Sequence, residues 1–308
     1  MVRRAIAMQV STKIFNDQAL EKFADTSKKI QDTQSQISTG KNLLRASDDP
    51  VAAANISIVK DKLKDLYQFK NNIDDTTGRL ELCEISISEM QNICTRIYEL
   101  SLMSANDTYN ATDRQTVKAE ITSLKQMMIA LVNTKDTNGD AIFAGYKSNI
   151  IPFVEDETGA VSFNGNQGTS MLQISETQKS ATSINGSDAF MRITTDNGYE
   201  DIFNIVNEIT QALDANTVNK SAINNIKDAA DHFGIKMTEI GSLINISDQQ
   251  RSVIDKRIQL MTEDLSNLED ADLTVLVSTL QNLLLTRDAS QQSFALIGQQ
   301  SLFDYIRM

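Results

Sequence analysis

Tryptophan is absent from this sequence of 308 residues, proline and cysteine occur twice each, and aromatic residues make up 6%. So few large anchors and helix breakers favour long, thin helices over a thick globular core. His232 is the single histidine, which excludes a histidine-based triad or a multi-histidine metal site within one chain. We therefore expect no enzyme activity, no metal and no cofactor.

The two cysteines are expected to be structural. Cys83 and Cys94 are eleven residues apart inside one predicted helix, which separates them by about 16 Å along its axis. That distance is too long for a disulfide. Free cysteine usually behaves as a small buried hydrophobic residue, so we expect packing residues rather than reactive thiols.

Long apolar runs and a surplus of positive charge are also missing. The run MMIALV at 127–132 is far shorter than a membrane span of about 20 residues. Arg3 and Arg4 are followed by only AIAM, so the hydrophobic region of a cleavable signal is absent. The formal net charge of −12 argues against nucleic acid and anionic membranes as partners. These grounds alone favour a cytoplasmic protein with no membrane insertion.

Apolar residues recur every seven positions after Asp49. The repeat consists of Val59, Leu66, Ile73, Leu80, Ile87 and Cys94. A strict seven-residue repeat predicts a helix of roughly 80 Å, to about Ser104, packed along another long helix. The companion stripe is polar and consists of Lys70, Thr77, Glu84 and Gln91. We therefore expect one member of a helical bundle, not a self-sufficient zipper.

The composition of the sequence changes at Asn138, where glycine becomes frequent and the helical periodicity of apolar residues stops. Short β-type runs occur at 160–163, 171–174 and 190–194, and Asn164-Gly165 and Asn185-Gly186 lie between them. Asn-Gly is a strong hairpin-turn signal, so a small inserted β domain is predicted. We expect the acidic run Glu155 to Glu157 to be solvated charge in a turn rather than an acid–base site.

The stretch 37–54 reads as a helix stop, a short ordered loop and a helix start. Gly40 suits a left-handed helix C-terminal cap. Asp48 and Asp49 precede Pro50, and an aspartate cap before a first-turn proline is a strong helix start. The register of the second long helical run slips after Ala271, where the apolar stripe restarts at Leu273.

The expected organisation is nested, mainly α with an inserted small β domain. Terminal helices at 1–48 and 270–308 flank a helical domain at 49–137 and 199–269, and that domain flanks the β insertion at 138–198. The simplest pairing of the long helices is antiparallel, which predicts a long helical rod whose terminal helices form a coiled-coil-like axial core.

The nesting and several motifs resemble the flagellin superfamily along essentially the whole chain. The motifs are MQVST at 8–12, ISTGK at 37–41, DDP at 48–50, NGDAIFAGYKSNIIPF at 138–153 and ASQQSFALIGQQSLFDYI at 289–306. Within the superfamily, the elements at 48–50, 142–145 and 301–305 resemble hook–filament junction proteins more than flagellins. The family pattern begins at Met8, so Met1 and Met8 both stay open as the start.

The resemblance implies a secreted structural protein of the bacterial flagellum. Export through the flagellar type III channel needs no cleavable signal, which reverses the cytoplasmic assignment. The implied partners are hook-associated protein 1, flagellin, sister subunits in a junction ring, and a cytoplasmic export chaperone on the C-terminal helix. The alternatives are a flagellin filament subunit and, in another class, a cytoplasmic coiled-coil scaffold.

Terminal helices that bury too little apolar surface alone gain order when they pack on similar chains. We expect apolar residues from both ends of the chain to form this subunit interface. They are Ile14, Phe23, Ile30, Ile37, Leu276, Leu280, Leu283, Phe294, Ile297, Leu302, Phe303 and Ile306.

Overall fold

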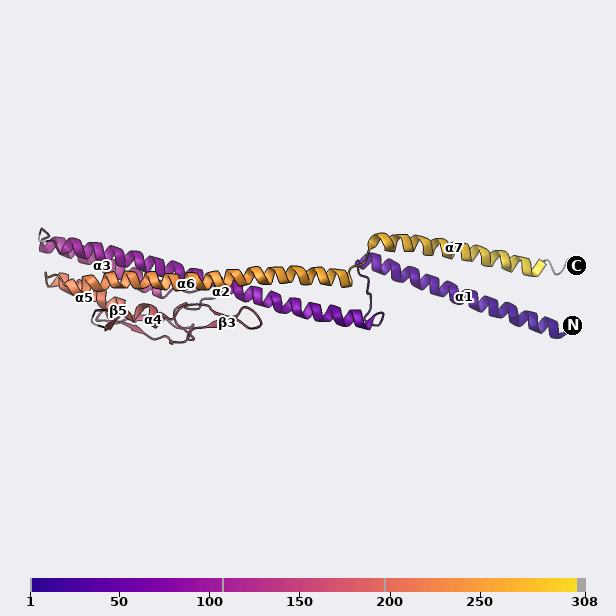
Figure 1. Ribbon diagram of the computed structural model, residues 1–308, viewed down its shortest axis with the longest axis horizontal. Helices are drawn as coiled ribbons and strands as arrows, with labels where there is room; N and C mark the ends of the chain where they lie inside the picture. Colours follow the sequence, from indigo (N-terminus) through magenta and orange to yellow (C-terminus); the bar gives the residue numbers. More distant parts are fainter. Residues whose placement is uncertain (1, 107, 197, 304–308) are drawn as a thin grey trace. The chain divides into compact units, whose positions relative to one another are not determined.

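The computed structural model describes residues 2–106, 108–196 and 198–303, with side chains from residue 13 to residue 296 apart from the same gaps (Figure 1). The helices are α1 (Val2–Thr39), α2 (Pro50–Ser104), α3 (Ala111–Val132), α4 (Gly186–Phe190), α5 (Ile202–Asp214), α6 (Lys220–Glu269) and α7 (Leu273–Phe303). The strands are β1 (Phe153–Glu155), β2 (Val161–Phe163), β3 (Met171–Gln173), β4 (Lys179–Ala181), β5 (Ile193–Thr195) and β6 (Gly198–Glu200). The predicted fold class, mainly helical with a small β insertion, is confirmed.

The chain divides into two compact units. The terminal unit comprises Met1–Lys64 and Ile258–Met308, and the central unit comprises Asp65–Arg257. The helices α2 and α6 contribute to both. The three-part division inferred from composition stays a prediction.

Helices α2 and α6 run antiparallel in the central unit. Lys70 Nζ lies 2.6 Å from Asp255 Oδ1, and further along α2 Gln91 Nε2 donates a 3.1 Å hydrogen bond to the Ala230 carbonyl. Residues with increasing numbers on α2 therefore contact residues with decreasing numbers on α6, as in an antiparallel pair. The seven-residue stripe forms the buried side of α2, and Ile73, Leu80, Ile87 and Cys94 have no exposed surface.

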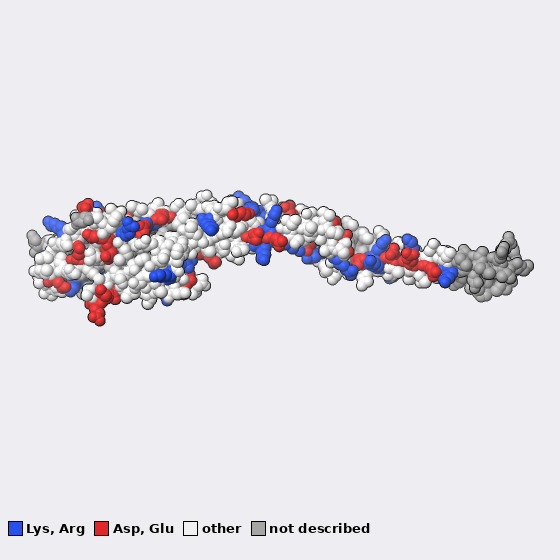
Figure 2. All heavy atoms as spheres, turned by 90° about the horizontal axis from the view of Figure 1, so that it is seen from below, with Lys and Arg blue, Asp and Glu red and all other residues white. Residues whose placement is uncertain are grey.

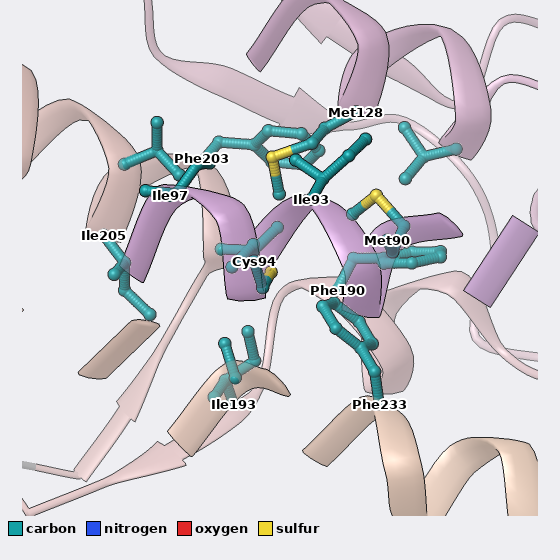
Figure 3. Packing of buried hydrophobic residues seen from close by; sticks show 14 of the residues in the cluster. Met90, Ile93, Cys94, Ile97, Met128, Phe190, Ile193, Phe203, Ile205 and Phe233 are labelled. Carbon is teal, nitrogen blue, oxygen red and sulfur yellow. The ribbon is translucent and has the colours of Figure 1, made fainter. Parts of the chain in front are cut away.

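The core of the central unit gathers around the second half of α2. Figure 3 shows side chains of α3, α4, α5 and α6 arranged about Cys94 and its neighbours. Helix α3 begins with a capping box, in which Asn110 Oδ1 accepts from Asp113 N and Asp113 Oδ2 accepts from Asn110 N. That box fixes the start of a helix whose Ile121 and Met128 are fully buried.

In its described residues, the insertion contains three separate antiparallel strand pairs, β1–β2, β3–β4 and β5–β6. The predicted Asn-Gly hairpin turns are wrong. Asn164-Gly165 leaves β2 toward β3, which pairs with β4, and Asn185 caps helix α4. The predicted strand run at 190–194 is partly wrong because Phe190 ends that helix. Local Asn-Gly chemistry also suits helix starts and connections, so tertiary pairing decided its use.

Phenylalanine rings join the insertion to the helices. The centroid of the Phe190 ring lies 5.0 Å from the ring centroid of Phe143, 5.5 Å from that of Phe153 and 5.9 Å from that of Phe233 on α6. The Phe153 ring also lies 6.1 Å from Phe203 on α5. Two-stranded hairpins are marginal alone, so the insertion is stabilised by sharing the core of the helices.

Asp156 and Glu157 are exposed in the β1–β2 turn, as expected for solvated charge, but the expectation is wrong for Glu155, which lies in β1 and is partly buried. Glu155 Oε1 accepts a 2.6 Å hydrogen bond from Lys125 Nζ, whose side chain is 5% exposed. Asp156 Oδ1 accepts from the backbone of Thr158 and Ala160, which closes the β1–β2 turn. The pattern alone did not reveal Lys125, because it lies on a helix 30 residues away.

Candidate assembly surface

Two breaks between long helices lie beside each other in the terminal unit. Gly40 ends α1 at φ +68°, a left-handed conformation that glycine adopts without strain. Its N–H donates to Gln36 O at 2.8 Å. Asp49 Oδ1 then accepts from the N–H groups of Val51 and Ala52 at 3.0 and 2.9 Å, which caps α2 at Pro50. Asp48 Oδ2 accepts from Arg45 N inside the loop.

The loop after α1 is bonded to the break between α6 and α7. Asn42 N donates to Glu269 O at 2.8 Å, and Ala271 N donates to Gly40 O at 2.9 Å. The Glu269 carboxylate, 12% exposed, pairs with Lys41 and with Lys60 Nζ at 2.9 Å. These hydrogen bonds, from Lys41 first and Lys60 second, hold the pKa of Glu269 below its usual range. Glu269 therefore stays charged at neutral pH and ties the four helix ends together.

From this joint, α1 and α7 run antiparallel and pack on each other (Figure 1). The Phe294 ring of α7 stacks on Phe15 at 6.0 Å and meets Phe23 edge-on at 5.7 Å. Nearer the joint, Ile30 is buried. The contact is intramolecular, so within one chain α1 and α7 already bury part of each other's apolar surface.

The predicted interface residues fall into four groups by burial. Six are half-buried where α1 meets α7, and they are Phe23, Ile37, Leu276, Leu280, Leu283 and Phe294. Ile30 is buried and Ile14 is exposed. Helix α7 continues through 297–303, but the side chains of Ile297, Leu302 and Phe303 lie outside the described residues, as does Ile306 altogether. Their role between subunits stays a prediction.

Further apolar side chains of the terminal helices are exposed, and the sequence reasoning missed them. They are Phe15, Leu20, Leu273, Val275, Val277, Leu285 and Leu296. Leu285 is 69% exposed. The missed signal was the run LTVLV at 273–277 with LLL at 283–285, which spreads apolar residues beyond a single stripe of α7. One neighbouring helix covers only one such stripe.

A shallow groove of about 530 Å³ lies between α1 and α7, lined by Phe15, Phe23, Leu285 and Phe294 among others. Acidic and basic side chains are intermixed over the face drawn in Figure 2. In the part of the chain that the structure describes, no group of three or more His, Cys, Asp or Glu could hold a metal ion. No described helix is both long and apolar enough to cross a membrane. The exposed apolar side chains of α1 and α7 form a surface through which the terminal helices can associate with another apolar surface.

Comparison with known proteins shows which class of helical protein the chain resembles. Residues 10–148 match the family model described as the bacterial flagellin N-terminal helical region. A flagellin of Clostridium tyrobutyricum is 25% identical over 58% of this chain and 46% of its own length. Over residues 10–148 the chain resembles the flagellin superfamily.

Similarity over the full length points to one member of that superfamily. Flagellar hook-associated protein 3 of Salmonella typhimurium is 22% identical over 97% of this chain and 100% of its own length. The crystal structure of flagellar hook-associated protein-3 from Legionella pneumophila superposes with a TM-score of 0.65 at 17% identity. That superposition covers 69% of this chain and 98% of the other, and it shows that the fold is shared.

Proposed function

We propose that this chain is a structural subunit of the bacterial flagellum that joins the hook to the flagellin filament. The proposal is supported above all by its similarity to hook-associated protein 3 from end to end, whereas the flagellin of C. tyrobutyricum matches over less than half its length. Its partners are then hook-associated protein 1 on the hook side, flagellin on the filament side and sister subunits in a ring.

The apolar outer face of the terminal helices supplies a physical mechanism. Leu285 and Leu296 on α7 and Leu20 on α1 are each more than half exposed, so a lone chain leaves them in water. Burying an exposed leucine stabilises association by about 1.5–3 kcal/mol when the burial is complete. Terminal helices of neighbouring subunits can provide that cover, and their ordering then accompanies assembly.

A charge on the outer face tests this mechanism. Leu285→Glu adds a carboxylate to an exposed apolar position and leaves the α1–α7 contact at Phe294 in place. Gln281→Glu, at an exposed position one turn earlier, adds the same charge without removing apolar surface. We expect sedimentation of concentrated protein to show weaker self-association for Leu285→Glu alone, with unchanged helix content in both variants.

The biological role is tested in a strain that lacks this chain. Electron microscopy of that strain should show hooks without filaments, and expression of the wild-type chain or Gln281→Glu should restore filaments. Leu285→Glu should restore them poorly. Normal filaments in the deletion strain would contradict a junction role.

Two alternatives are separated by simple observations. A flagellin would polymerise alone into long filaments, which a junction subunit should not do. A cytoplasmic scaffold would be missing from flagella sheared off the cell surface, where a junction subunit should be found by mass spectrometry.

Export through the flagellar type III apparatus, with a chaperone covering the C-terminal helix, completes the proposal. It rests on the family resemblance of residues 289–306. A hookless strain that retains the export apparatus should release the chain into the medium, and a strain without the apparatus should not.

A further inference from the structure

The insertion contains four Asn-Gly dipeptides, at 138–139, 164–165, 185–186 and 197–198. Asparagine is a thermolabile residue, and a following glycine makes it more so because no side chain hinders the approach of the next backbone nitrogen. Position 197 lies outside the described residues. The other three can be compared by what holds the two reacting groups, the asparagine carboxamide and the glycine N–H.

Asn185 is held at both ends of its carboxamide. Its Oδ1 accepts a 2.8 Å hydrogen bond from Ser187 N, which caps α4, and its Nδ2 donates to the Gln167 carbonyl. Turning the carboxamide carbon toward Gly186 N would break both bonds. The fold therefore protects this dipeptide.

Asn138 is protected through its neighbour. Gly139 N donates a 3.0 Å hydrogen bond to the Asp136 carbonyl, and Asn138 N donates to Asp136 Oδ1 at 2.9 Å. The turn has to open before the glycine nitrogen can act as a nucleophile.

Asn164 differs from both. Its own N–H donates to Pro152 O at 2.8 Å, which extends the β1–β2 pairing and anchors the backbone. Its side chain is exposed, and within the described residues neither its carboxamide nor Gly165 N–H has a hydrogen-bond partner. Both reacting groups are thus available in the folded chain.

The fold also requires the glycine that makes this bond labile. A Cβ atom at position 165 would lie 2.3 Å from Phe163 Cζ and 3.1 Å from the Ala144 carbonyl oxygen. The Phe163 ring packs 5.0 Å from that of Phe153, so it is not free to swing away. Replacing Gly165 by a residue that would slow the reaction therefore disturbs the aromatic core.

We propose that Asn164 is a site of spontaneous modification to aspartate and isoaspartate. Gly165 N loses its proton and attacks Cγ of Asn164, the Cγ–Nδ2 bond breaks, and ammonia leaves with the proton. Water then opens the resulting succinimide at either carbonyl, which gives aspartate or isoaspartate. The sum is replacement of ammonia by water, with no oxidation or reduction.

The products change the exit from β2. Each product carries a new negative charge. Isoaspartate also adds a carbon to the main chain at residue 164, two residues before Asn166, whose N–H donates to Ala144 O at 2.9 Å. Subunits in a long-lived assembly would accumulate the modified form with age.

Timed incubation of the purified full chain at neutral and mildly alkaline pH tests the proposal. Peptide mass spectrometry, with isoaspartyl carboxyl methyltransferase labelling, follows all sites in one sample. We expect Asn164 to convert several-fold faster than Asn138 or Asn185 in the folded chain, and the three rates to converge in urea. Asn164→Gln should remove most of the early methyltransferase signal.

Two outcomes overturn the proposal. One is conversion of Asn138 or Asn185 at least as fast as Asn164 in the folded chain. The other is a rate at Asn164 that rises strongly on unfolding, because that would mean that the fold protects this site too. Helix content measured on Asn164→Gln distinguishes loss of the site from loss of the fold.

Discussion

The Nζ atom of Lys125 lies 2.6 Å from Oε1 of Glu155 and joins helix α3 to the first hairpin of the insertion. The same ammonium donates to the Gly159 carbonyl, and Gln126 donates to Glu155 Oε2. Burial by itself raises the pKa of Glu155, but these hydrogen bonds outweigh it and hold the pKa below its usual range. The hairpin is therefore fixed to α3 by a charged contact whose lysine is almost closed to solvent.

Lys125→Met should destabilise the central unit by about 2–3 kcal/mol, toward the lower end for a broken buried pair because Glu155 keeps some solvent contact. Urea unfolding followed by circular dichroism measures the change. The control is Lys118→Met, which breaks an exposed 2.6 Å pair with Asp214 and should cost less than about 1 kcal/mol. Equal losses in the two variants would mean that burial of Lys125 contributes nothing.

The pair between Glu176 and Arg257 should make stability depend on acid pH. The hydrogen bond from Arg257 is the main cause that lowers the pKa of Glu176 from 4.5 to about 2. Because the folded pKa is the lower one, the stabilisation is present above pH 4.5 and is lost as pH falls toward about 2. Both side chains are well exposed, so the effect is small and weakens in salt.

Arg257→Gln should therefore flatten part of the decline in stability across that pH window. Thermal melts of both proteins at several pH values, at low and high salt, measure the difference. A difference in melting temperature between wild type and variant that stays the same down to pH 2 would argue against this ion pair as its source.

Asp49→Ala should lower the free energy of unfolding by about 1 kcal/mol, because two first-turn N–H groups of α2 lose their acceptor. Hydrogen exchange should accelerate at Val51 and Ala52, near the helix start. Asp61→Ala, an exposed position inside the same helix, serves as the control and should change stability little.

The thiols of Cys83 and Cys94 should report unfolding. Burial is the main cause that raises the pKa of Cys83 to about 12 and the pKa of Cys94 even further. A thiol reagent at pH 8 should leave both unmodified in the folded chain and modify both in urea, since only the thiolate reacts. Rapid labelling of either cysteine without denaturant would show that the core around α2 opens readily.

The seven-residue stripe was sufficient to predict the long helix α2 and its buried side, because a repeat of that length is typical of a long helix packed along another. The capping residues Asp49 and Pro50 likewise predicted that α2 begins at the end of the loop that follows Gly40. The strand pairing was not predictable, because Asn164-Gly165 and Asn185-Gly186 have the same local turn preference and different tertiary surroundings.

The assembly surface was predictable only in part. The sequence indicated which terminal residues are apolar, but a stripe cannot say whether its partner is the same chain or another. The structure places Phe294 against Phe15 and Phe23 of its own chain. It leaves Leu285 and Leu296 exposed instead, because the apolar residues of α7 extend beyond the one stripe that a neighbouring helix covers.

The sequence by itself determined the helical class, the presence of a small β insertion and the chemistry of the helix ends, since those depend on periodicity and on residues close together along the chain. Tertiary structure decided which strands pair, that Lys125 meets Glu155, and which apolar side chains stay in water. Those outcomes depend on contacts between residues far apart in sequence, whose distances no local pattern records.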